Sequence, residues 1–110
     1  MHELAITQNI VDTIVERTDS AEILAVHMRI GKVAGVVPDA VRFCFDLVAQ
    51  GSPVAGARLE IDEPPGRARC RTCGDEFAVE DLALLCSCGS TEVAVIGGDE
   101  LSVTAVEVAA

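Results

Sequence analysis

The sequence contains no Trp and no Tyr and only three Phe, so it lacks the aromatic side chains on which single-stranded nucleic acids stack. Basic residues are also few, because eight Lys and Arg face eighteen Asp and Glu for a formal charge of −10. A protein of this charge repels phosphate backbones and anionic membrane surfaces. We therefore expect no nucleic-acid and no membrane partner, and the charge favours cations or a basic protein.

Long apolar segments are absent as well. The longest apolar runs, such as residues 33–37 and 82–86, are far shorter than the ~20 residues needed to cross a bilayer. The chain does not open with a basic segment followed by an apolar stretch, which an export signal would require. Half of the residues are nevertheless apolar, as is typical of a globular protein. We expect a soluble cytoplasmic protein.

Hydrophobic periodicity predicts two helices. The first covers residues 2–18, and the second runs from Pro38, a favoured first residue of a helix, to about Gly51. The apolar stripe of the first helix is expected to contain Leu4, Val11 and Val15 with Ile10 and Ile14 beside them. The inner stripe of the second is expected to contain Ala40, Val41, Cys44, Leu47 and Val48.

Alternation of apolar and polar residues predicts four strands, over residues 22–30, 57–62, 92–96 and 101–108. The last two are expected to form a hairpin around Gly97-Gly98-Asp99. The element order indicates an α+β domain interrupted by a cysteine-rich segment. The composition changes at Pro64, so we assign residues 1–66 and 91–110 to the α+β domain and residues 67–90 to the insert.

Four of the five cysteines form two closely spaced pairs. Cys70 and Cys73 are separated by two residues and followed by Gly74, which is the spacing of a metal knuckle. Cys86 and Cys88 are separated by one residue, where a zinc ribbon normally has two. Four thiolates can still close a tetrahedral zinc site, because zinc with its full d shell tolerates small distortions. A structural zinc would also explain how an insert with few apolar side chains folds.

Other uses of these cysteines compete with zinc. Disulfides are disfavoured in a cytoplasmic chain, and no thioredoxin-like βαβ unit surrounds the pairs to suggest redox catalysis. A rubredoxin-type iron site would share the ligands, but Phe77 is the only aromatic residue nearby. Zinc is therefore favoured. We expect the fifth cysteine, Cys44, to pack in the core, and His27 to be an exposed imidazole.

The opening residues Met1-His2-Glu3 can bind a second kind of metal ion. The Met1 amine, the His2 amide nitrogen and the His2 imidazole can wrap one ion in fused chelate rings, and Glu3 can supply a fourth donor. Ni(II) and Cu(II) prefer such planar nitrogen ligands, whereas zinc prefers a tetrahedron. Taken alone, however, three residues are more typical of an ordinary polar start of a helix.

The triplet is accompanied by further motifs along the whole chain. These are Arg29-Ile30-Gly31, Gly35-Val36-Val37-Pro38, Arg42-Phe43, Ala68-Arg69-Cys70-Arg71-Thr72-Cys73-Gly74 and Cys86-Ser87-Cys88-Gly89-Ser90. In this order and spacing the sequence resembles the HypA/HybF family, nickel metallochaperones of [NiFe]-hydrogenase maturation. The shortened second knuckle is the one departure from the family pattern.

The resemblance implies a nickel-binding α+β domain, with a small mixed or antiparallel sheet and two helices, and an inserted zinc-ribbon-like domain. It implies nickel ligation by Met1, His2 and Glu3, and structural zinc ligation by Cys70, Cys73, Cys86 and Cys88. Family members deliver Ni(II), a transient cargo, to the hydrogenase large subunit together with a GTP-hydrolysing partner, and some also serve urease. A cytoplasmic, non-enzymatic monomer or homodimer is expected.

Two other functions are compatible with the residues alone. A zinc-ribbon adaptor would hold the same zinc but bind no nickel, and its N-terminal triplet would be incidental. A small metalloenzyme is less favoured, because the chain has only two His, His2 and His27, and four thiolates would leave no open position on zinc.

Overall fold

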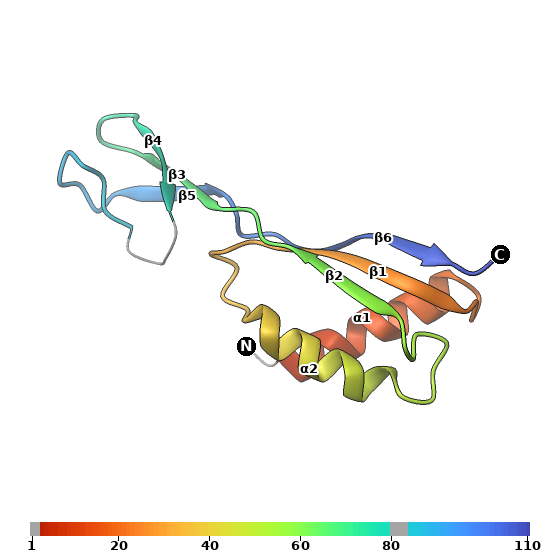
Figure 1. Cartoon of the computed structure of the whole chain (residues 1–110). Helices are drawn as coiled ribbons and strands as arrows, with labels where there is room; N and C mark the ends of the chain where they lie inside the picture. Colours follow the sequence, from red (N-terminus) through yellow and green to blue (C-terminus); the bar gives the residue numbers. More distant parts are fainter. Residues whose placement is uncertain (1–2, 80–83) are drawn as a thin grey trace. The chain divides into compact units, whose positions relative to one another are not determined.

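The computed structural model describes residues 3–79 and 84–110, which form two helices and six strands (Figure 1). In chain order they are α1 (Glu3–Arg17), β1 (Ile23–Ile30), α2 (Pro38–Ala49), β2 (Arg58–Asp62), β3 (Gly66–Cys70), β4 (Glu76–Val79), β5 (Val93–Gly97) and β6 (Leu101–Val108). Within the described residues, neither helix has the length and apolar character of a membrane span. The order of helices and strands confirms the α+β class and both predicted helices.

The strands form two three-stranded sheets, in the orders β2-β1-β6 and β4-β3-β5. The chain also divides into two compact units. The first comprises the residues up to Met28, Val36–Ile61 and Val103–Ala110, and the second comprises Arg29–Gly35 and Asp62–Ser102. The second unit thus includes β5, which lies outside the predicted 67–90 insert. The assignment of residues 67–90 to a zinc-binding domain stays a prediction.

The first unit packs both helices against one side of the sheet β2-β1-β6 (Figure 1). Strands β1 and β2 run parallel, since the Ile23 amide donates to the Pro53 carbonyl at one end and the Lys32 amide donates to the Pro64 carbonyl at the other. Parallel strands need a long crossover connection, which contains α2 here. Strand β6 runs antiparallel to β1, since the Ala109 amide donates to the Glu22 carbonyl at 3.0 Å. Side chains from β1 and both helices, including Val26, Met28 and Val41, are almost completely buried between these layers.

The helix stripes predicted from periodicity are wrong in part. On α2, Phe45 is only 2% exposed, whereas the predicted core residue Leu47 is 50% exposed. Val41, Phe45 and Ala49 form one i, i+4 ridge that faces the core, and Leu47 lies about 200° around the helix from Phe45. On α1, Leu4 is exposed by 56%. Its place in the buried row is taken by residues Thr7, Val11 and Ile14.

Thr7 is buried although it is polar, so hydrophobic periodicity could not identify it. Its hydroxyl donates to the Glu3 carbonyl one turn earlier at 2.6 Å. This bond satisfies the buried polar group, which would otherwise destabilise the core.

The second unit is built on the central strand β3, which pairs antiparallel with both β4 and β5. Its small core contains Val33, Ala68 and Val79, with Phe77 and Leu84 packed against them. The strands β3 and β4 form a hairpin that the sequence analysis did not predict. The first cysteine pair lies at the end of β3 and in the loop that connects it to β4.

The predicted hairpin between the last two strands is wrong. Strand β5 pairs with β3, and β6 pairs with β1, so the two strands belong to different sheets. The connecting Gly98 has a positive φ of 81°, and it is a point of close approach between backbones. A Cβ on Gly31 would lie 1.8 Å from the Gly98 carbonyl oxygen, and the Val33 amide donates to that same oxygen at 3.0 Å. Gly31 and Gly98 therefore allow two backbone segments to approach closely, and Gly98 does not form the predicted hairpin turn.

Candidate metal centre

The first cysteine pair lies where β3 ends and the loop to β4 begins. Cys70 is the last residue of β3, and its amide donates to the Asp75 carbonyl at 2.8 Å. The Gly74 amide donates to the Cys70 carbonyl at 2.9 Å, and Gly74 has the positive φ of 80° that such a turn requires. The Cys73 amide also lies 3.4 Å from the Cys70 sulfur as a donor. The loop is therefore shaped to present amides and thiols together.

The second pair forms a similar turn in spite of its shorter spacing. The Cys86 amide donates to the Ser90 carbonyl at 3.1 Å, and the Gly89 amide donates to the Cys86 carbonyl at 2.9 Å. Gly89 supplies the left-handed conformation, with a φ of 91°. The turn therefore closes with only Ser87 between the two thiols.

Strand pairing brings the two turns together. Val93 of β5 lies opposite Cys70 of β3, and the Arg71 amide donates to the Glu92 carbonyl at 2.7 Å. The hydroxyls of Thr72 and Ser90 are hydrogen bonded at 2.8 Å and so connect one turn directly to the other.

The four sulfur atoms have the spacing of a tetrahedral metal site. The sulfurs of Cys70 and Cys88 lie 3.7 Å apart, those of Cys73 and Cys86 lie 3.6 Å apart, and all four lie within 4.8 Å of one another. A tetrahedron of sulfurs around zinc at about 2.3 Å requires a sulfur–sulfur distance of about 3.8 Å. The donor set therefore fits a four-coordinate thiolate site, and the shortened knuckle does not prevent it.

The thiols influence one another's protonation. The hydrogen bond from the Cys73 amide is the main cause that lowers the pKa of Cys70, which falls to about 6. For Cys73, the Asp75 amide lowers the pKa, but Cys86, desolvation and the other thiols together raise it to about 12. One member of the group thus ionises readily while a neighbour retains its proton. A bound cation would remove this competition, because metals bind the thiolate form.

The structure tests only part of the predicted N-terminal site. Met1 and His2 lie outside the described residues. The Glu3 carboxylate accepts from the amide of Val37, the N-cap residue of α2, at 3.5 Å. The Val37 side chain makes no capping hydrogen bond of its own, so Glu3 supplies an acceptor at a helix N-terminus, where a negative charge is favourable. The start of α1 is thereby held beside the start of α2.

Two residues that the sequence analysis noted in passing have different surroundings. Cys44 is partly buried on α2 and does not belong to the sulfur cluster, in agreement with a packing role. His27 is not a plain exposed imidazole, since Glu60 and Glu107 flank its two ring nitrogens. Sequence reasoning missed these two glutamates because each lies on a separate strand and looks like an ordinary outward-facing residue.

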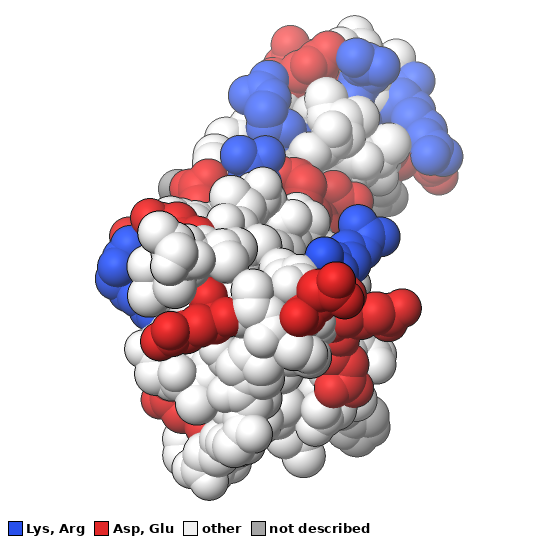
Figure 2. All heavy atoms as spheres, turned by 90° about the vertical axis from the view of Figure 1, so that its right-hand side faces the viewer, with Lys and Arg blue, Asp and Glu red and all other residues white. Residues whose placement is uncertain are grey.

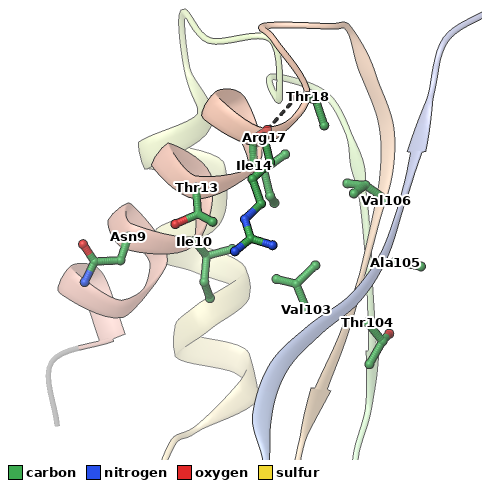
Figure 3. Close-up of a pocket in the computed structure, with 10 residues that line it drawn as sticks. All are labelled: Asn9, Ile10, Thr13, Ile14, Arg17, Thr18, Val103, Thr104, Ala105 and Val106. Carbon is green, nitrogen blue, oxygen red and sulfur yellow. Dashed lines mark hydrogen bonds between the residues drawn. The ribbon is translucent and has the colours of Figure 1, made fainter.

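A groove of about 430 Å³ lies between α1 and β6 in the first unit (Figure 3). It is lined by Asn9, Ile10, Thr13, Ile14, Arg17, Thr18, Val103, Thr104, Ala105 and Val106. None of these residues offers a thiolate, imidazole or carboxylate ligand. The groove is therefore no metal site.

Acidic side chains are scattered over the face shown in Figure 2, which agrees with the net charge.

Comparison with known proteins identifies the family. Residues 1–108 match the family model described as "Hydrogenase/urease nickel incorporation, metallochaperone, hypA". The chain belongs to the HypA family. The family resemblance predicted from the sequence motifs is confirmed, and HypA-family proteins are hydrogenase maturation nickel metallochaperones rather than a family of enzymes.

Individual members of the HypA family align with this chain over nearly their whole length. The chain is 47% identical to the hydrogenase maturation factor HypA of Trichormus variabilis, covering 98% of this chain and 96% of that one. It is 44% identical to the HypA of Geobacter sulfurreducens, with 98% and 99% covered. A solution structure of the Ni metallochaperone HypA from Helicobacter pylori superposes with a TM-score of 0.68 at 23% identity, over 98% and 97% of the two chains. This last similarity supports the fold.

Proposed function

We propose that this protein binds Ni(II) at its N-terminus and delivers it during the maturation of [NiFe]-hydrogenase, while a structural zinc ion holds the cysteine turns together. The observation that carries the proposal is the family match over residues 1–108, which includes the Met1-His2-Glu3 start and both cysteine pairs. The chemistry of the two donor sets supports separate roles, with nickel bound by the nitrogen-rich N-terminus and zinc bound by the four cysteine thiolates.

The nickel ligands in this proposal are the Met1 amine, the amide and imidazole nitrogens of His2, and Glu3. Nitrogen-rich planar ligation suits Ni(II), and ligands at a chain end can release the ion to a partner. The Glu3 contact with Val37 supports the proposal, since it holds the last residue of the chelate beside the start of α2. If the Glu3 carboxylate keeps its hydrogen bond to Val37 in the nickel-bound protein, the Glu3 side chain positions the chelate and the Glu3 backbone supplies the fourth donor.

The zinc ligands in this proposal are Cys70, Cys73, Cys86 and Cys88. The sulfur spacing supports them, and two of the four thiols are buried. Zinc that is bound by four thiolates has no open position for water or substrate, so its role is structural. This closed ligand set supports a carrier without catalytic activity of its own.

The partners follow from the same proposal. We expect transfer of nickel to the hydrogenase large subunit in the cytoplasm, with the help of a GTP-hydrolysing insertion protein, and we treat urease maturation proteins as a second destination to be tested. The proposed carrier acts as a monomer or a homodimer.

Nickel binding is tested with protein that carries its native, unextended start. Adding one residue before Met1, or changing His2→Gln, should abolish high-affinity Ni(II) binding in calorimetric titration, while circular dichroism and zinc content stay unchanged. Gln at position 2 is bulky, so the initiator Met1 should not be cleaved off, because that cleavage requires a small second residue. The control is His27→Asn, which removes the other imidazole and should retain the tight site. Undiminished tight binding in both N-terminal variants would show that the ion is bound elsewhere.

Zinc binding is tested by metal analysis of two single-cysteine variants. The parent protein and Cys44→Ser should each contain one zinc ion per chain, because Cys44 lies outside the sulfur cluster. Cys73→Ser should lose zinc and the amide dispersion of β3 and β4 in NMR spectra. A Cys73→Ser protein with full zinc content, or an unchanged spectrum after metal removal, would contradict a structural zinc.

A further inference from the structure

Among the residues that the structure describes, one more group of metal-binding side chains besides the cysteine cluster is brought together, and it lies in the first unit. His27 lies on β1, which is the central strand of its sheet, and Glu60 and Glu107 lie on the flanking strands β2 and β6. One possible ligand atom from each of the three lies within 4.8 Å of the other two. His27 alternates with the buried Val26 and Met28, so the group projects from the face of the sheet opposite the helices.

Both ring nitrogens of His27 face a carboxylate. Nε2 lies 2.9 Å from Glu107 Oε2, and Nδ1 lies 3.3 Å from Glu60 Oε2. A neutral imidazole has one N–H, so it can donate to only one of these oxygens and must direct a lone pair at the other. A second proton or a divalent cation relieves this conflict, because either one accepts the lone pair and attracts the carboxylates.

The distances suit a transition-metal ion. Two adjacent ligands at about 2.1 Å and a right angle around a metal lie about 3.0 Å apart, which is close to the 2.9 Å between Nε2 and Glu107 Oε2. The side chains of Glu60 and Glu107 are 49% and 52% exposed, so water can complete the shell and Glu60 can turn toward the ion. One imidazole and two carboxylates form a ligand set for octahedral divalent metals.

Arg58 is the cation that now partly neutralises the two carboxylates of this group. Its guanidinium donates to Glu107 Oε2 at 2.9 Å and lies 3.5 Å from Glu60 Oε2. With one guanidinium and two carboxylates, the group keeps a net negative charge that attracts a divalent ion. The Arg58 side chain is 60% exposed and can move into solvent. It therefore competes with a metal ion without blocking it permanently.

We infer that His27, Glu60 and Glu107 form a second, weaker site for a divalent transition-metal ion, which binds there by displacing the Arg58 guanidinium. The inference goes beyond the proposed N-terminal nickel site and does not depend on it, since none of its ligands is shared with that site. Such a site would hold an additional ion on the same unit when nickel is abundant.

The test uses zinc-loaded protein with His2→Gln, in which His27 is the only remaining imidazole. Nickel chloride is titrated while the imidazole resonances are followed by NMR and the heat by calorimetry. We expect one weak site per chain, with paramagnetic broadening confined to His27 and neighbouring signals, because octahedral Ni(II) is paramagnetic whereas planar amide-bound Ni(II) is not. An unperturbed His27 resonance at saturating nickel would overturn the inference.

Two further substitutions in the His2→Gln background distinguish this site from nonspecific binding. His27→Asn should abolish the weak site. Arg58→Gln should tighten it about tenfold, because a cation that competes with and repels the metal is removed. Arg42→Gln, an exposed arginine of the same unit that is paired with Asp39, is the matched control and should leave the affinity unchanged. Equal tightening by both arginine changes, or weak binding that survives His27→Asn, would contradict the site.

Discussion

The burial of Phe45 gives the sharpest test of the fold, because α2 also carries a nearly matched exposed residue. Phe45 is 2% exposed, whereas Phe43 is 67% exposed. Burying a Phe side chain contributes about 1.5–3 kcal/mol by transfer from water. The cavity that remains after truncation raises the total cost of Phe45→Ala to about 3–5 kcal/mol. That cost is a large part of the roughly 5–15 kcal/mol by which proteins of this size are stable.

Phe43→Ala should change the free energy of unfolding by no more than about 0.5 kcal/mol, as for other exposed positions. The assay is urea denaturation followed by far-ultraviolet circular dichroism, which reports the two helices of the first unit. Equal losses in both variants, or a loss below about 1 kcal/mol for Phe45→Ala, would refute the packing of α2 described above.

Two further predictions concern the second unit. Gly31→Ala should destabilise the zinc-loaded protein by about 1–3 kcal/mol in thermal denaturation, since its Cβ would lie 1.8 Å from the Gly98 carbonyl oxygen; an unchanged melting temperature would refute this close approach. The hydrogen bond and charge of Arg69 lower the pKa of Glu76, so the ionised carboxylate stabilises the folded state at neutral pH, and this contribution is lost as the pH falls through the lowered pKa. The stability difference between the parent protein and Glu76→Gln should therefore vanish in acid, and a difference that grows in acid would contradict the ion pair.

Local patterns in the sequence were sufficient for most of the elements and for the family. The predicted helices and the strand 101–108 match α1, α2 and β6 closely, because each pattern depends on residues only a few positions apart. The four cysteines could be grouped from spacing alone, and the structure does bring their sulfurs together. The N-terminal triplet was notable only in company with the other motifs, and its metal chemistry stays a proposal.

Strand partners could not be predicted in the same way. The segments around Gly97-Gly98-Asp99 have the composition of a hairpin, yet β5 and β6 pair with β3 and β1 instead. Strand pairing depends on which distant strands offer a free edge and a buried face. The residues of two strands that are adjacent in the sequence do not identify those distant partners. The close approach of Gly98 to Gly31 exists only after both sheets have formed.

The sequence by itself determined both helices, four of the six strands, the acidic charge, the thiol pairs and the family. These follow from composition, local periodicity and the order of short motifs, and none of them requires knowing which distant residues meet. Only the tertiary structure decided that Phe45 rather than Leu47 enters the core, and that His27 lies between two glutamates. Periodicity specifies the apolar sector of a helix, but the packing partners select the ridge within it that is buried. Likewise, three strands far apart in the chain must align in one register before their side chains can share a cation.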